Sequence, residues 1–117
     1  MTATEQALSQ KLCPAVKEKN LIKFWYEDDD STKNDWRTVE PHLIGIHKST
    51  GNALLTAWFL PDSEQKSKGW KEEWKTFKLL NISKEKILSQ KYIKTRKDYN
   101  PKDSRMSQIL CSTEVVL

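Results

Sequence analysis

The chain has 117 residues, of which 37% are hydrophobic and 31% charged. This composition is typical of a single soluble globular domain that buries its own core. No apolar run is long enough to cross a bilayer, and the first twenty residues lack the apolar region of a signal peptide. We therefore expect a cytoplasmic protein without a membrane partner. The two cysteines, Cys13 and Cys111, could pair only if the chain ends meet, and reduced thiols are the simpler expectation.

The net charge of +4 is unevenly distributed. Residues 1–60 carry 7 basic and 8 acidic side chains, a balance of −1, whereas residues 61–117 carry 13 and 8, a balance of +5. The surplus lies between Lys84 and Arg105. Such a segment attracts phosphates and acidic partners in general, or it is simply a solvated face.

The first twenty residues are expected to form a helix. Thr2 and Glu5 have the spacing of a capping box, and Leu8, Leu12 and Val16 recur every four residues on one helical face. Pro14 interrupts the pattern, since proline removes a backbone donor. We predict one bent or split helix whose apolar stripe covers a sheet.

Three consecutive antiparallel strands follow, over residues 21–26, 36–47 and 53–60. An acidic loop (27–35) and a polar turn (48–52) connect them, and their bulky and β-branched residues are typical of strands. The first and third strands carry large side chains on both faces, which favours a small closed or half-closed barrel over a flat exposed sheet.

The second half is less regular. A polar loop is expected over residues 61–71 and a fourth strand over 74–79. Residues 82–88 form a fifth strand or a helical turn, which periodicity does not decide. The basic tail from Lys94 is rich in turns, and its apolar residues 109–110 and 115–117 could dock back onto the domain.

Arg37 is the candidate binding residue in the second strand. A guanidinium beside aromatic rings offers a planar fork for a carboxylate or phosphate. The alternative is a structural arginine paired with Glu40 or with one of the acids at 28–30.

Metal binding is not expected. His42 and His47 are five residues apart, so a regular strand points them to opposite faces. The acidic loop lacks the glycine and glutamate that an EF-hand requires, and a solvated hairpin tip is the better interpretation.

The five tryptophans admit two interpretations. Trp36, Trp58 and Trp74 lie in expected strands and could pair across them, or they could line a pocket that stacks bases or rings. Trp70, in the 61–71 loop, is expected to be the most exposed.

No catalytic pattern is present. Neither cysteine has a histidine near it in sequence, there is no G-x-S-x-G run, and the chain has only 3 glycines. We expect neither an enzyme nor a cofactor.

Four short runs follow one another along the chain. They are Trp25-Tyr26, then Arg37, Val39, Pro41 and His42, then Gly51, Leu55 and Ala57, and finally Lys75, Phe77, Leu79 and Ile82. In this order and spacing they resemble the WYL-domain family of bacteria and phages, over residues 12–106, and Tyr99-Asn100-Pro101 matches a frequent family ending. The name-giving triplet falls on Ala53, Leu54 and Leu55, so only its leucine is kept. Lys75 and Asn81 stand where the family has arginine.

The resemblance implies an Sm-like, SH3-type β-barrel with a leading helix, and a regulatory, ligand-sensing role with nucleic acid or nucleotides as ligands. We therefore expect a helix over 1–20, a WYL-like barrel domain over 21–106 and a C-terminal tail over 107–117. The expected function is non-enzymatic binding of an anionic ligand, a nucleotide or single-stranded nucleic acid, in transcription regulation with a partner. The expected groove is lined by Tyr26, Arg37, His42, Trp74 and Lys75. The alternative is a protein-interaction subunit or homodimer without a small-molecule ligand.

Overall fold

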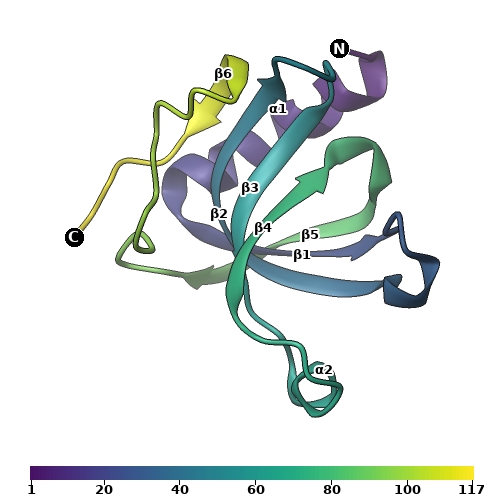
Figure 1. Ribbon diagram of the computed structural model, residues 1–117. Helices are drawn as coiled ribbons and strands as arrows, with labels where there is room; N and C mark the ends of the chain where they lie inside the picture. Colours follow the sequence, from purple (N-terminus) through teal and green to yellow (C-terminus); the bar gives the residue numbers. More distant parts are fainter.

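The computed structural model describes residues 1–117 and is mainly β, with one long helix at its N-terminus, as predicted (Figure 1). The expected strands are all present, and residues 82–88, left undecided between a strand and a helical turn, belong to a strand. The elements are α1 (Ala3–Glu18), β1 (Asn20–Tyr26), η1 (Ser31–Lys33), β2 (Asp35–His47), β3 (Ala53–Phe59), α2 (Ser63–Ser67), β4 (Glu73–Lys78), η2 (Leu79–Asn81), β5 (Ile82–Lys91) and β6 (Met106–Ser112).

Helix α1 begins at the predicted capping box, in which the Thr2 side chain accepts from the Glu5 backbone N–H and the Glu5 carboxylate accepts from the Thr2 N–H. The other Glu5 oxygen accepts from the Ala53 N–H of β3 at 2.8 Å. The stripe of Leu8, Leu12 and Val16 is buried against the sheet. Pro14 lies inside one uninterrupted helix. Capping and the apolar stripe together fix the helix behind the sheet (Figure 1).

Strand β2 is the centre of the sheet. Its first half pairs with β1, from Asp35 opposite Tyr26 to Val39 opposite Ile22. Its second half pairs on the same edge with β6, and β3 runs along its other edge. Irregularities in register between Pro41 and Leu43 let this long strand bend between its partners.

The predicted barrel is not confirmed, because the sheet does not close. The strand order is β4-β3-β2-β1-β5, which leaves β4 and β5 as edges, with β6 added to β2. Two layers cover the faces instead. Helix α1 covers the inner face, where the core includes Phe24 and Leu55. On the outer face, Tyr92 and Tyr99 contact His42. The apolar residues on both sides of the strands are thus explained by these coverings.

The expectation of two reduced thiols is wrong. Cys13 in α1 and Cys111 in β6 form a disulfide, with Cα atoms 5.8 Å apart. Strand β6 reaches the helix because it pairs with the second half of β2, beside α1 (Figure 1). The chain ends therefore do meet, which local sequence patterns do not reveal.

Two further segments differ from expectation. The 61–71 loop contains the short helix α2, begun by a capping box between Asp62 and Gln65. Residues 109–110 do dock back, as part of β6, whereas residues 115–117 stay exposed. No helix in the structure has both the length and the apolarity needed to span a bilayer.

Candidate functional site

A hollow of about 600 Å³ opens between β4 and the acidic loop that joins β1 to β2. Its walls come from β1, β2, β3, β4, the turn between β2 and β3, and the loop that follows α2. The residues that line it include Tyr26, Asp28, Asp29, Lys33, Arg37, Phe59, Trp70, Glu73, Lys75, Phe77 and Lys78. Three of the five predicted site residues, Tyr26, Arg37 and Lys75, are therefore brought together here.

Arg37 lies at the back of the hollow and is only 5% exposed. Its Nη2 donates to the Lys33 carbonyl at 2.7 Å and to Asp28 Oδ2 at 3.4 Å. The guanidinium carbon is 4.6 Å from the centre of the Trp70 ring. Burial lowers the pKa of Arg37 and Asp28 opposes that effect, but an arginine stays charged at neutral pH. Arg37 is therefore a structural arginine paired with an acid, as in the predicted alternative. It also borders a cavity, as the candidate binding residue should.

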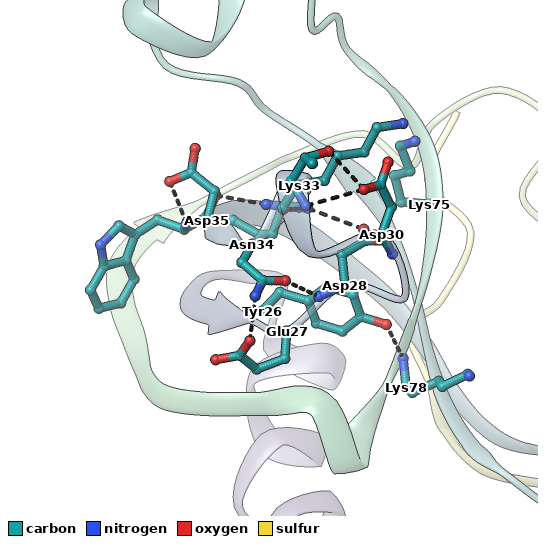
Figure 2. Close-up of polar contacts among 12 residues, drawn as sticks. Tyr26, Glu27, Asp28, Asp30, Lys33, Asn34, Asp35, Lys75 and Lys78 are labelled. Atoms are coloured by element: carbon teal, nitrogen blue, oxygen red, sulfur yellow. Dashed lines mark hydrogen bonds and ion pairs between the residues drawn. The ribbon is translucent and has the colours of Figure 1, made fainter.

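The acidic loop is held in shape by its own side chains (Figure 2). The Asn34 side chain accepts from the Asp28 N–H at 2.7 Å and donates to Glu27 at 2.6 Å. Asp30 caps the turn η1 by accepting from the Thr32 N–H. These bonds fix the Lys33 carbonyl where Arg37 can donate to it. Two other carboxylates of the loop reach outside it, because Asp28 bonds to Arg37 and Asp29 pairs with Lys78.

Tyr26 forms the wall beside β4. Its hydroxyl oxygen accepts from the Lys78 N–H at 2.9 Å (Figure 2). Its ring meets that of Phe77 edge to face, with the ring centres 5.0 Å apart. Burial raises the pKa of the Tyr26 hydroxyl, so the phenol is neutral at physiological pH. Tyr26 therefore anchors β4 as well as lining the hollow.

Lysine side chains surround the mouth of the hollow. Lys78 pairs with Asp29 at 3.3 Å and Lys75 with Glu73 at 3.9 Å, and all four side chains are more than a third exposed. Pairs of this kind contribute little to stability because water screens them. Lys33 has no ion-pair partner. Lys33 and Lys75 are therefore able to turn toward a bound anion.

His42 and Trp74 lie outside this hollow. His42 is completely buried on the outer face, stacked on Tyr92 at 4.9 Å. Its Nδ1–H donates to the Glu40 carbonyl at 2.8 Å, and its Nε2 accepts from the Arg96 N–H at 3.2 Å. Burial lowers the pKa of His42 to about 4, so the ring is neutral. Trp74 contacts His42 edge to face. The five predicted residues therefore do not form one groove.

Sequence reasoning did not single out Lys33, Lys78 or Trp70 as site residues. Trp70 was expected to be exposed, but it packs on Phe59 and on Arg37. The missed signal is the capping box of α2, whose Gln65 is buried and donates to the Trp36 carbonyl at 2.7 Å. That anchor draws the following residues, including Trp70, onto the domain. Trp58 and Trp74 pair across β3 and β4, which is one of the two interpretations left open for the strand tryptophans.

The fold defines a small domain in which one helix covers an open antiparallel sheet, and the hollow lies at an edge of that sheet. No protein-family model matches the sequence, and no curated protein matches it significantly. The structure is similar to that of proteasome accessory factor B/C (PafBC) of Arthrobacter aurescens, with a TM-score of 0.58 and 21% sequence identity. The match covers 78% of this chain and 13% of that chain, so this chain spans only a small part of that protein's length. The likeness concerns the fold alone.

Proposed function

We propose that this chain is a non-enzymatic, ligand-sensing module of WYL type that binds an anionic ligand, a nucleotide or short single-stranded nucleic acid. It acts in transcription regulation together with a partner, in the cytoplasm. The sequence runs that resemble the WYL family and the WYL-like fold support this class of protein. The hollow beside β4 is the proposed binding site.

The observation that carries the proposal is a hollow of ligand size with a fixed, buried guanidinium at its back. Basic side chains outnumber acidic ones on its walls, with Lys33, Arg37, Lys75 and Lys78 against Asp28, Asp29 and Glu73. Pockets of a few hundred Å³ with a few fixed polar groups are typical small-molecule sites. Because Arg37 is already bonded to the loop, it supplies a steady positive charge. Lys33 and Lys75 make the direct contacts to phosphate, and Tyr26 and Trp70 provide aromatic surface.

The test is a titration of the protein with adenosine nucleotides and a short oligothymidylate, followed by tryptophan fluorescence. We expect the double variant Lys33→Ala/Lys75→Ala to weaken binding about tenfold or more, and added salt to weaken it in the unchanged protein. The matched control is Lys84→Ala/Lys86→Ala, which removes two exposed lysines of β5 outside the hollow. Equal binding by both double variants would refute the site.

Arg37 needs a separate variant, because its loss frees the acidic loop. Arg37→Lys keeps the charge but cannot reproduce the fork that meets Lys33 and Asp28. We expect weaker ligand binding and a modest loss of stability, measured together by titration and thermal unfolding. Unchanged affinity in a folded Arg37→Lys protein argues against any role of the guanidinium in the site.

A second candidate is a protein-interaction subunit or homodimer with no small-molecule ligand. Apolar side chains near the C-terminal residues support it, with Ile93 79% and Leu117 97% exposed. Backbone and side-chain bonds between Thr95 and Val116 hold these two segments side by side. Sedimentation over a range of concentrations separates the candidates. If the measured mass stays that of a monomer at all concentrations, the homodimer is excluded. If the protein self-associates and Ile93→Ser abolishes this, the homodimer is supported.

A further inference from the structure

A second cavity of about 420 Å³ lies on the outer face of β3 and β4, beneath the loop that leads into β6. Its lining residues are Leu43, Thr56, Trp74, Lys75, Thr76, Asp98, Tyr99, Asn100, Asp103 and Arg105. Only Lys75 and Thr76 also border the hollow described above. The inference drawn from this cavity does not depend on the proposed anionic ligand.

Two aromatic rings form a rigid wall of this cavity. Trp74 and Tyr99 lie with their ring centres 6.4 Å apart and their planes at 29°. The Trp74 indole donates to the Lys97 carbonyl at 2.9 Å, and the Tyr99 hydroxyl bonds to the Thr113 carbonyl at 2.8 Å. Both rings are therefore fixed before any ligand arrives, which lowers the entropic cost of binding.

Several polar groups in the cavity have hydrogen-bonding capacity to spare. The Thr56 hydroxyl is buried and has no partner in the protein. Thr76 lies directly opposite Thr56 in the register of β3 and β4 and shares its face of the sheet. Asp98, whose backbone is left-handed at φ 71°, makes no ion pair. Asn100 uses its side-chain oxygen to accept from the Lys102 N–H, which leaves its two amide donors free. Hydroxyl, carboxylate and amide groups that can still form hydrogen bonds thus line the same cavity.

The charges in this cavity balance. The lining residues carry two formal positive and two formal negative charges: Arg105 and Asp103 are joined by a close ion pair at 2.6 Å, and Lys75 and Asp98 are the other cation and anion. An anion or a cation gains no net electrostatic attraction here, unlike in the first hollow. A neutral ligand with many hydroxyl groups can satisfy the free donors and acceptors and lay its C–H face on an aromatic ring.

From these observations we propose that the outer cavity is a binding site for a neutral, polyhydroxylated ligand about the size of one sugar ring. The Thr56 hydroxyl and the Asp98 carboxylate bond to ligand hydroxyls, Asn100 donates to a ligand oxygen, and Trp74 stacks on the ring. A site built to hydrogen-bond hydroxyl groups discriminates strongly against analogues that lack them.

The experiment is a titration of the ¹⁵N-labelled full chain with glucose, galactose, mannose and ribose, each at millimolar concentration. The Trp74 indole N–H and the amides of Thr56, Thr76 and Asn100 report on the cavity, and the Trp25 indole on another part of the sheet. We expect saturable shifts in the first group with at least one sugar. Glucosamine and glucuronic acid, which carry a charge on a similar ring, should bind more weakly than the neutral sugar.

Two variants test the assigned groups. Thr56→Val keeps the shape of a strand residue and removes the hydroxyl, and Asp98→Asn keeps a residue that tolerates a left-handed backbone. Each should weaken sugar binding roughly fivefold, the loss expected for one hydrogen bond. The matched control Thr38→Val, in β2 and outside both cavities, should leave binding unchanged.

Three results would overturn the proposal. The first is the absence of saturable shifts with all four neutral sugars in the folded protein. The second is equal affinity in Thr56→Val, Asp98→Asn and Thr38→Val. The third is tighter binding of either charged sugar, which would assign the cavity to a different class of ligand. Nucleotide binding at the first hollow is measured separately, so failure of one site does not decide the other.

Discussion

Arg96 holds the carboxylate of Glu40 with two parallel hydrogen bonds, from Nε to Oε1 at 2.7 Å and from Nη2 to Oε2 at 3.0 Å. Glu40 is buried in β2, and Arg96 belongs to the segment between β5 and β6 that crosses the outer face. The Arg96 N–H also donates to His42. This one residue therefore fastens the crossing segment to the middle of the sheet.

Replacing Arg96 with alanine should destabilise the domain by about 2 kcal/mol. The change leaves a buried carboxylate without its partner, which costs about 3–5 kcal/mol in a fully buried pair. The smaller value is expected because the Arg96 side chain is 36% exposed and water reaches it. Urea unfolding measures the effect. Arg96→Lys should recover only part of it, since lysine cannot bond both oxygens in this geometry. Full recovery by lysine would show that the charge alone matters.

Stability should fall as the pH drops from about 6.5 to about 4, because of His42. Burial, with Arg96 and Lys19 nearby, lowers the pKa of His42 from its ordinary 6.5 to about 4. Across this interval the unfolded state binds a proton that the folded state does not, so stability is complete above 6.5 and is lost as the pH falls. The loss amounts to about 3 kcal/mol at most.

Thermal unfolding at half-unit steps between pH 7 and pH 4.5 checks this dependence. The variant His42→Gln should be less stable at pH 7, and its stability should no longer fall with pH above pH 5. In the control His47→Asn, at the end of the same strand, stability should still fall with pH as in the unchanged protein. If the stability of His42→Gln still falls with pH in this range, the pH dependence is due to other groups.

Breaking the disulfide should cost about 2–5 kcal/mol, because Cys13 and Cys111 close a loop over a sequence separation of 98 residues. Urea unfolding with and without a thiol reductant measures the difference. The double variant Cys13→Ala/Cys111→Ala should have the same free energy of unfolding as the reduced protein, and the reductant should not change it. Two titratable thiols in the protein as purified without reductant, under denaturing conditions, would contradict the bond. Because a cytoplasm is reducing, the proposed location requires the domain to fold in the reduced form too.

Gly45→Ala should destabilise the sheet by about 1–3 kcal/mol through overpacking. A Cβ atom at this position would lie 2.9 Å from Met106 Cγ and 3.0 Å from the Gln108 carbonyl oxygen. The methionine can move, but the backbone oxygen is held in β6. Chemical unfolding of Gly45→Ala and of Gly45→Ala/Met106→Ala tests this. If the second change restores full stability, the clash is with the side chain alone.

Sequence patterns predicted those parts of the fold that depend on neighbours in the chain. The capping box of α1, the alternation in β1 and β3, and the turn at Gly51 are all local, and all are present. Strand β5 was left undecided because most of its side chains are exposed, so it shows no apolar alternation. The pairing of the second half of β2 and the disulfide depend on where β6 lies, which no short-range signal contains.

The candidate site was also predicted only in part, because local patterns place some of its residues and not others. Tyr26, Arg37 and Lys75 follow from their strands and do meet in the hollow. His42 was assigned to that groove by its place in the Arg37 to His42 run. Arg37 and His42 are five residues apart, so alternation along β2 places them on opposite faces, and Tyr92 covers His42 on the outer face. The prediction for His42 was therefore wrong because it followed the resemblance of the run and not the alternation of the strand.

One edge of β2 is completed by two strands from distant parts of the chain, β1 before it and β6 long after it. During translation, the half of that edge beside Leu43–His47 stays unpaired until the ribosome has released residues as late as Ser112. Contacts between such remote positions slow folding and leave intermediates prone to aggregate. A nascent chain of this protein should therefore complete its sheet only once residues 106–112 have left the ribosome, and chaperones that shield exposed strand edges should raise its yield.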